Sequence, residues 1–240
     1  MHSLSPRAVI CDLYHTVLRV EPAPSDREAQ WQALRSEFLS VLSPATFATF
    51  EERARFQVAA DHAQAQAAGI AQPEVFWPDI VRAVVPEAAA WSAERLSDFM
   101  LRQAGLTHRI SLQPGCADVL RRFQLRGGLL GIASNAQPYT HRELSRALAE
   151  AGEPELAFDP QLCFWSYDHG FSKPDPHVFR LLTARLRQYG IAAHETLMIG
   201  DRLDNDIEPA RAQGWLTWRL APGDGVDGGT WSQLGTRLGL

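Results

Sequence analysis

An aspartate, Asp12, follows directly after the short apolar run of residues 8–11. The run contains valine and isoleucine, a pattern that is typical of a buried strand. In an open parallel sheet, ligands bind outside the carboxyl ends of the strands, so Asp12 stands where chemistry is expected. A carboxylate there can attack an electrophile, hold a metal ion, or simply start a turn. Asp12 taken alone leaves these three interpretations open.

Three further apolar runs lead into polar residues of complementary kinds. Residues 130–133 are followed by Ser134 and Asn135, and residues 162–165 precede the loop that contains Lys173. Residues 196–200 end at an acidic cluster, which consists of Asp201, Asp204, Asn205 and Asp206. The order along the chain is therefore a carboxylate, a hydroxyl, an ammonium group and a group of acids. Each segment is a weak signal alone, whereas the ordered set of four is a strong one.

The elements that must position these residues fall into two groups. Between residues 21 and 108, apolar side chains recur at spacings of three and four, which predicts helices only, and Pro22 and Pro24 are expected to break regular structure before them. After Pro114, helical patterns alternate with short apolar runs, which predicts a parallel sheet with right-handed crossovers. The prediction is an α/β protein with a Rossmann-like core at residues 1–20 and 109–240, and an inserted all-helical domain at residues 21–108.

Composition excludes several classes of function. The 240 residues are 45% hydrophobic, enough for a sizeable core, and the net charge of −5 argues against a general nucleic-acid or anionic-membrane binder. No apolar run approaches the roughly 20 residues of a membrane span, and a secretory signal is not expected. The three cysteines, Cys11, Cys116 and Cys163, are predicted to be buried free thiols of a cytoplasmic protein. The expected partner is a small-molecule substrate, and monomer and homodimer both stay open.

The four ordered segments resemble the motifs of the haloacid dehalogenase (HAD) superfamily of hydrolases over nearly the whole chain. The resemblance implies that Asp12 is a nucleophile that forms an aspartyl-phosphate, and that Thr16 fixes the loop and binds phosphate. It also implies that Ser134 and Asn135 bind the phosphoryl oxygens, and that Lys173 offsets negative charge. The helical insert corresponds to the family's cap, which closes over the site and selects the substrate.

The fourth segment implies a magnesium site. The resemblance assigns Mg²⁺ to Asp12, the backbone oxygen of Tyr14 and Asp201, with Asp206 as the second acid, which orients the shell through water or Lys173. Asp204 is a possible substitute for Asp206 and otherwise a solvated acid. Without a cation, such a cluster of carboxylates would repel itself and a phosphate, which favours magnesium.

Tyr14 departs from the phosphatase pattern. The family's phosphatases usually carry an acid/base aspartate two residues after the nucleophile, whereas its metal-free 2-haloacid dehalogenases carry tyrosine there. A phenol with a pKa of about 10 is a poor base at neutral pH. We hypothesise that His15 supplies part of the missing function, and an unchanged pH–rate profile in His15→Ala would contradict this. Dehalogenases also hold the substrate carboxylate with an arginine near the start of the cap, for which Arg27 and Arg35 are candidates.

The acidic segment from Gly200 to Asp206 resembles the magnesium-binding phosphatase version, and an extra aspartate in a metal-free site would be costly. The sequence therefore favours a magnesium-dependent phosphatase of a small phosphorylated metabolite. Two alternatives stay open: a 2-haloacid dehalogenase, and a catalytically degenerate protein that binds a phosphorylated ligand without turnover.

Overall fold

The computed structural model describes residues 4–22, 25–40, 42–221 and 228–240. Its centre is a parallel sheet with the strand order β5-β4-β1-β6-β7-β8. The strands are β1 (Ala8–Cys11), β4 (Leu129–Ser134), β5 (Cys163–Trp165), β6 (Thr196–Gly200), β7 (Leu216–Leu220) and β8 (Gly228–Gly229). The predicted α/β class with a Rossmann-like sheet is confirmed. Asp12, just past β1, lies at the middle of the sheet because β4 and β6 flank β1.

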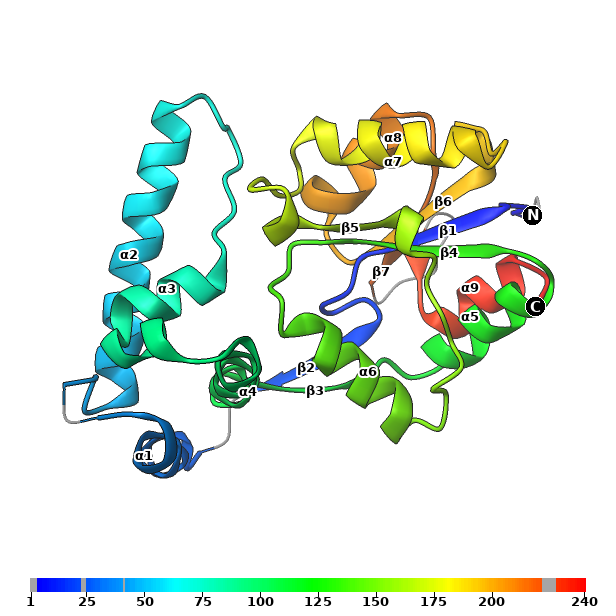
Figure 1. Ribbon diagram of the computed structural model, residues 1–240. Helices are drawn as coiled ribbons and strands as arrows, with labels where there is room; N and C mark the ends of the chain where they lie inside the picture. The colour runs from blue at the N-terminus through cyan, green and yellow to red at the C-terminus, as the bar shows by residue number, and fades with distance from the viewer. Residues whose placement is uncertain (1–3, 23–24, 41, 222–227) are drawn as a thin grey trace.

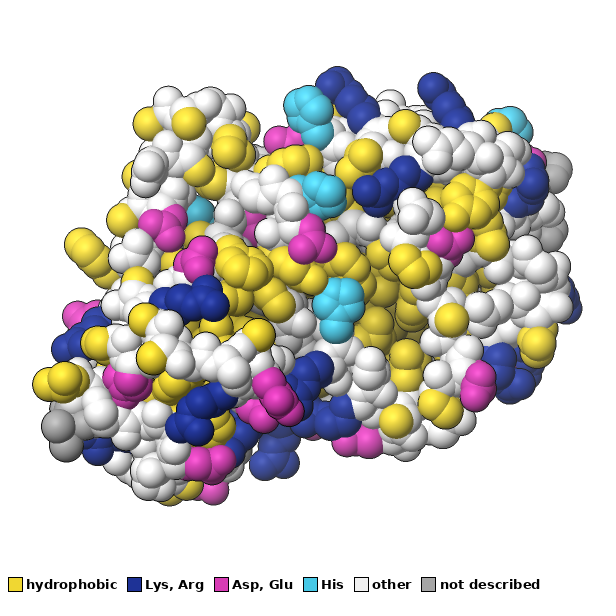
Figure 2. Space-filling view, in the orientation of Figure 1, with side chains coloured by type: hydrophobic (Ala, Val, Ile, Leu, Met, Phe, Trp, Pro, Cys, Tyr) yellow, Lys and Arg dark blue, Asp and Glu magenta, His cyan; other side chains and the backbone are white. Residues whose placement is uncertain are grey.

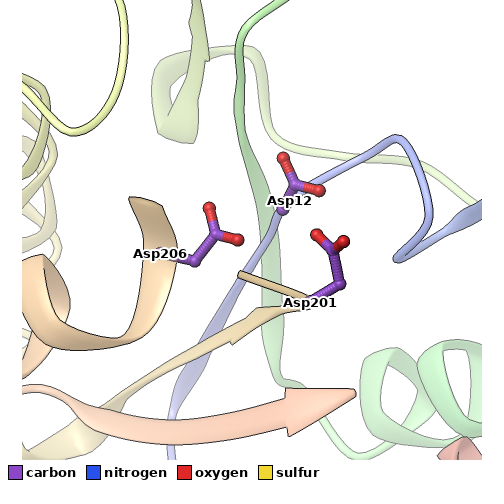
Figure 3. Close-up of side chains that lie close together, drawn as sticks. All are labelled: Asp12, Asp201 and Asp206. Carbon is purple, nitrogen blue, oxygen red and sulfur yellow. The ribbon is translucent and has the colours of Figure 1, made fainter. Parts of the chain in front are cut away.

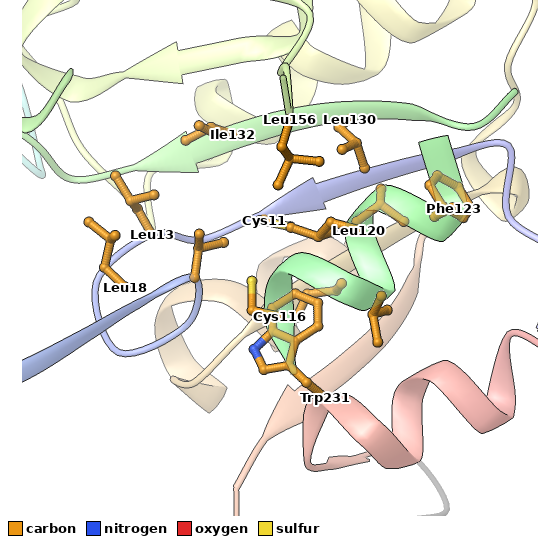
Figure 4. Close-up of a cluster of buried hydrophobic side chains, with 14 of the residues drawn as sticks. Cys11, Leu13, Leu18, Cys116, Leu120, Phe123, Leu130, Ile132, Leu156 and Trp231 are labelled. Atoms are coloured by element: carbon orange, nitrogen blue, oxygen red, sulfur yellow. The ribbon is translucent and has the colours of Figure 1, made fainter. Parts of the chain in front are cut away.

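Helices cover both faces of this sheet (Figure 1). α7 (Pro176–Gln188) and α8 (Glu208–Ala212) lie on one face, and α5 (Cys116–Leu125), α6 (Thr140–Glu150) and α9 (Trp231–Arg237) lie on the other. Successive residues of β1 alternate between the two cores: Val9 and Cys11 pack with the α5 side, and Ala8 and Ile10 pack with the α7 side. The α5-side core, shown in Figure 4, lies directly beneath the loop that follows β1.

The insert is helical and has a core of its own. It contains α1 (Arg27–Phe38), α2 (Phe47–Ala67), α3 (Trp77–Val84) and α4 (Ala93–Ala104), which lie beside the sheet region in Figure 1. Aromatic rings dominate its interior, with Trp31 within 5.2 Å of Phe50, measured between ring centroids. Ser92 caps α4 by accepting a hydrogen bond from the backbone N–H of Arg95. Asp26 precedes α1 without capping it.

The sequence analysis missed a two-stranded ribbon at the junction of the insert and the sheet. β2 (Leu18–Pro22) pairs antiparallel with β3 (His108–Leu112). The expectation that Pro22 breaks regular structure is therefore wrong, because Pro22 is the last residue of a strand, and Pro24 lies outside the described residues. Proline is tolerated there because it is the terminal residue of an edge strand. The predicted domain boundaries at residues 20/21 and 108/109 fall within β2 and at the start of β3, and the division itself stays a prediction.

The sequence also predicted the absence of a membrane span and the presence of free thiols. Among the described residues, no helix is long and apolar enough to cross a membrane. The three cysteines are free thiols; Cys11 and Cys116 are buried and Cys163 is partly buried. Burial raises the pKa of the Cys163 thiol to about 11, so this thiol is protonated at neutral pH.

Candidate active site

Three aspartates from two segments converge at the carboxyl end of the sheet (Figure 3). Asp12 and Asp201 follow the neighbouring strands β1 and β6, and Asp206 lies on the single π-helical turn of residues Leu203–Ile207. One carboxylate oxygen from each of the three lies within 4.8 Å of the others. Asp12 continues the pairing of the sheet through its N–H, which donates to the carbonyl of Ile199 at 2.8 Å. The position of Asp12 is thus set by the backbone of the sheet.

Lys173 joins two of these acids. Its ammonium donates to Oδ1 of Asp12 and to Oδ1 of Asp206, both at 2.6 Å, and its side chain is 0% exposed. Burial alone would lower the pKa of Lys173, but the two carboxylates outweigh it and hold that pKa above its ordinary value. Lys173 is also the only lysine of the chain. The buried ammonium therefore stays protonated and supplies a fixed positive charge beside Asp12.

Asp206 is held from both ends. Its Oδ2 accepts a hydrogen bond from the N–H of Arg202 at 3.1 Å, while Oδ1 faces Lys173. Gly200 permits this approach, because a Cβ at that position would lie 2.4 Å from the Cβ of Asp206. Asp204, the alternative from the sequence, is exposed and pairs with the guanidinium of Arg202 at 2.7 Å. Asp206, not Asp204, is the second acid that lies near Asp12.

Two buried hydroxyls near the strand ends have no hydrogen-bond partner among the described residues. They are Thr16 Oγ1 and Ser134 Oγ, and both residues are fully buried. A buried polar group without a partner is unusual, and hydroxyls of this kind are available to a ligand. Asn135, by contrast, is already occupied: its side chain bonds the backbone N–H and C=O of Lys173 at 2.8 and 2.9 Å. Its observed contacts position the lysine.

The hydroxyl of Tyr14 contacts α6. Its hydroxyl donates to Oε2 of Glu143 at 2.6 Å and lies 2.7 Å from the hydroxyl of Thr140. The other oxygen of Glu143 lies 2.9 Å from Nε2 of His108, on β3. Burial and the nearby carboxylate of Glu143 raise the pKa of Tyr14 well above its ordinary value. While this hydrogen bond is made, the phenolic proton is not available to a leaving group.

Glu143 was missed by the sequence analysis although a signal exists. Thr140, Glu143, Leu144 and Ala147 follow the spacing of a helix face that is otherwise buried, so a carboxylate falls on an inward stripe. A buried carboxylate requires partners, and these come from distant parts of the chain. The pattern indicates that Glu143 has a polar partner, but it does not identify Tyr14 and His108.

Tyr14→Phe tests this network. We expect the variant to lose about 1–3 kcal/mol of unfolding free energy, because Glu143, with its side chain 3% exposed, loses a donor. Urea denaturation monitored by circular dichroism measures the change. Tyr139→Phe is the matched control, since the Tyr139 hydroxyl makes no hydrogen bond to a described residue. Equal stability of the two variants would contradict the proposed role of the Tyr14–Glu143 bond.

A cavity of about 390 Å³ lies between the cap and the strand ends. Its polar lining comes from Tyr14, His15, Glu74, His108, Asn135 and Gln137. Val20, Ala136 and Tyr139 complete the wall. Figure 2 shows hydrophobic and histidine side chains along the hollow between the helical part and the sheet part of the molecule. His15, placed in the left-handed region at φ 65°, turns the chain at this wall.

The loop between α2 and α3 holds the cap against the core at the edge of this cavity. Glu74 donates its N–H to the carbonyl of Gly170 at 3.0 Å, and its carboxylate accepts from Ser166 at 2.7 Å. Gln137, in the loop after β4, donates to the carbonyl of Val75 at 2.9 Å and accepts from the N–H of Trp77 at 2.8 Å. Neither Glu74 nor Gln137 belongs to a motif, so sequence reasoning did not find them.

The acidic cluster can bind a metal ion. Burial and the neighbouring Asp206 raise the pKa of Asp201 above its ordinary value, which is the expected effect of crowded carboxylates. Asp206 is largely engaged by Lys173 and Arg202, whereas Asp12 and Asp201 present oxygens to the space between them. Carboxylate oxygens at one edge of a sheet are the donors that hard divalent cations prefer. The residues present therefore fit such an ion.

A family model for haloacid dehalogenase-like hydrolases matches residues 6–214. The chain belongs to the haloacid dehalogenase-like hydrolase family. Among curated HAD proteins, a phosphoserine phosphatase from Thermus thermophilus is 29% identical over 202 residues, which span 74% of this chain and 78% of that one. The predicted family is confirmed, and the protein is a hydrolase of a family that includes phosphatases.

Solved HAD structures share the fold. A 2-haloacid dehalogenase from Pseudomonas syringae pv. tomato DC3000 aligns with a TM-score of 0.58 and 18% identity, over 98% of both chains. A HAD phosphatase from Thermococcus onnurineus aligns with a TM-score of 0.54 and 19% identity, over 97% of this chain and 98% of that one. Sequence identity this low shows a shared fold only, so the choice between dehalogenase and phosphatase chemistry depends on the residues of the site.

Proposed function

We propose that this protein is a magnesium-dependent phosphatase of a small phosphorylated metabolite. The observation that carries the proposal is the arrangement of Asp12, Lys173 and Asp206, joined by two contacts of 2.6 Å, with Asp201 beside them. A nucleophilic carboxylate, a fixed cation and a further acid for a metal ion are the parts that phosphoryl transfer requires. The phosphoserine phosphatase relative supports the same interpretation.

In this proposal the reaction has two steps, and both use Asp12. A carboxylate oxygen of Asp12 attacks phosphorus, and the bond from phosphorus to the alcohol oxygen breaks, which leaves an aspartyl-phosphate and an alcohol that takes its proton from solvent water. Water then attacks phosphorus and releases phosphate and the free Asp12 carboxylate. Lys173 stabilises the negative charge that develops, and the unpaired hydroxyls of Thr16 and Ser134 bind phosphoryl oxygens. Asp206 is a positioning residue, because it reaches the reaction through Lys173.

Asp12, the backbone oxygen of Tyr14 and Asp201 would hold the magnesium ion. When bound, the ion neutralises charge on the phosphoryl oxygens and on the carboxylates around them. Without it, the acids that surround Asp12 would repel a phosphate dianion, and Lys173 alone would have to offset them. A small-molecule substrate that enters through the cavity completes the proposal, and the free thiols are consistent with a cytoplasmic location.

Dehalogenation of 2-haloacids is the second candidate, and Tyr14 is the observation that favours it. The positions of the two arginines that could hold the carboxylate of a haloacid argue against it. The guanidinium of Arg27 lies 5.8 Å from the Phe47 ring within the cap, and neither Arg27 nor Arg35 lines the described cavity. A third carboxylate, that of Asp201, is also costly beside Asp12 and Asp206 when Lys173 is the one cation that these two acids share. The residues therefore favour the phosphatase.

Removal of the metal separates the two candidates. We expect hydrolysis of an aryl phosphate to fall by a factor on the order of 10² or more after dialysis against EDTA, and to return with Mg²⁺, because the acidic cluster then regains its counter-charge. Phosphate release measures this, and chloride release from 2-chloropropionate is followed in parallel. Chloride release that is indifferent to EDTA, without phosphatase activity, would select the dehalogenase instead. The absence of both activities would favour the non-catalytic binder.

A further inference from the structure

The wall of the cavity beside the strand ends, which Tyr14 and Asn135 line, contains no lysine or arginine. This holds for all the residues that line the cavity in the described part of the chain. The only lysine, Lys173, is already held between two carboxylates, and the residues outside the described part include neither lysine nor arginine. A substrate group that reaches past the phosphate therefore meets no lysine or arginine on this wall, and the imidazole of His108 there is already paired with Glu143.

The arginines of the β2–β3 ribbon line a different hollow. Side chains alternate between the two faces of a strand, so Val20, which lines the cavity, lies on the opposite face from Arg19 and Glu21. Arg109 is the register partner of Glu21, and with Arg19 it lines a separate hollow beside Pro22 and Asp26. Val20 borders both hollows, but neither Arg19 nor Arg109 lines the cavity beside the strand ends.

Negative charge, by contrast, is present on the wall. The carboxylate of Glu74 lines the cavity and is bonded only by neutral donors: the N–H of Val75 at 2.9 Å, the amide of Gln137 at 3.1 Å and the hydroxyl of Ser166 at 2.7 Å. A second carboxylate, that of Glu143, lies behind the cavity residues Tyr14 and His108. Burial raises the pKa of Glu74 and the nearby His62 opposes this, while no lysine or arginine forms an ion pair with Glu74 among the described residues.

A substrate carboxylate would be repelled here. It would lose water and gain no cationic partner, and it would face Glu74 at close range, which is an unfavourable exchange for a desolvated charge. Hydroxyl groups or an ammonium group would instead meet an acceptor, the Glu74 carboxylate, whereas both ring nitrogens of His108 are already bonded, to Glu143 and Thr107. The wall thus discriminates by charge between leaving groups of similar size.

We propose that the substrate's alcohol portion is uncharged or cationic, as in polyol or amino-alcohol phosphates, and that phosphate esters with a carboxylate are discriminated against. The inference rests on the proposed phosphatase function and names the substrate class of that same site. Glu74 is the specificity-determining residue in this proposal.

Two matched pairs of substrates test it. Glycerol 3-phosphate and 3-phosphoglycerate share a three-carbon skeleton, in which a hydroxymethyl group of the first is a carboxylate in the second. Phosphoserine is phosphoethanolamine with one added carboxylate. With Mg²⁺ at neutral pH, we expect kcat/KM to be at least about tenfold higher for the member without the carboxylate in each pair, as for a like charge at short range. An aryl phosphate, which carries no such group, reports the basal activity.

Two variants with a matched control assign the effect to the wall. Glu74→Gln should raise kcat/KM for 3-phosphoglycerate relative to glycerol 3-phosphate several-fold, and Val20→Lys, which adds a cation on the cavity face of β2, should do the same. Glu87→Gln is the control, because Glu87 is a cap carboxylate that is likewise bonded by neutral donors, Ser40 and Ser43, but does not line the cavity. This control should leave the substrate ratio unchanged.

The outcomes that overturn the inference are separable from failure of the proposed function. Two outcomes overturn the inference alone, provided that the aryl phosphate is hydrolysed. The first is equal or faster turnover of 3-phosphoglycerate and phosphoserine, and the second is no turnover of glycerol 3-phosphate and phosphoethanolamine. An unchanged ratio in both Glu74→Gln and Val20→Lys overturns the role of the wall. A lack of hydrolysis of the aryl phosphate and of all four substrates overturns the phosphatase and the inference with it.

Discussion

Asp12→Asn is expected to lower the hydrolysis of an aryl phosphate by a factor on the order of 10³ or more. The amide cannot act as the nucleophile, and it also removes a charge from the proposed metal ligands. The fold should persist, because Lys173 keeps its contact of 2.6 Å with Asp206. Phosphate release in the presence of Mg²⁺ measures the loss, and circular dichroism checks the fold.

Asp204→Asn is the matched control for this prediction. Asp204 belongs to the same acidic segment as Asp201 and Asp206, but it is exposed and pairs with Arg202. Its replacement should change the rate by no more than about twofold, as is usual for exposed surface pairs. Substantial turnover by Asp12→Asn, or equal losses in both variants, would show that Asp12 is not the nucleophile.

Lys173→Met is expected to affect stability as well as activity. The variant leaves Asp12 and Asp206 close together and without their shared cation, and breaking a buried ion pair in this way typically costs about 3–5 kcal/mol. Activity should fall to background, because no fixed cation remains beside the nucleophile. Urea denaturation without added metal gives the change in unfolding free energy.

A second substitution separates charge from packing in this result. Asp206→Asn, added to Lys173→Met, removes one of the two uncompensated charges and should recover a large part of the lost stability while activity stays absent. If the loss came only from the altered volume of the side chain, the double variant would be no more stable than Lys173→Met. Such an outcome would contradict the explanation that the loss of stability comes from the uncompensated charges of Asp12 and Asp206.

Much of the fold and of the candidate site could be predicted from the sequence. A short apolar run that ends in a polar residue marks the carboxyl end of a strand, and parallel strands bring such ends to one edge. This rule places Asp12 and Asp201 at one edge, whereas Lys173 was expected there only from the resemblance to the HAD family. The helical insert was also predictable, because its periodicity differs from that of the strands. The β2–β3 ribbon was missed, since five-residue edge strands, one of them with a terminal proline, carry little pattern.

The sequence by itself determined which chemical groups meet at the sheet edge, because backbone topology follows from hydrophobic patterning. Only the tertiary structure decided how the side chains around them are used. Tyr14 donates to Glu143, 129 positions away, and Asn135 holds the backbone of Lys173, 38 positions away. Glu74 reaches the cavity wall in the same way, through the cap loop that contacts Ser166 and Gly170 of the core. Contacts of this kind depend on packing between distant segments, and the local spacing of residues does not predict them.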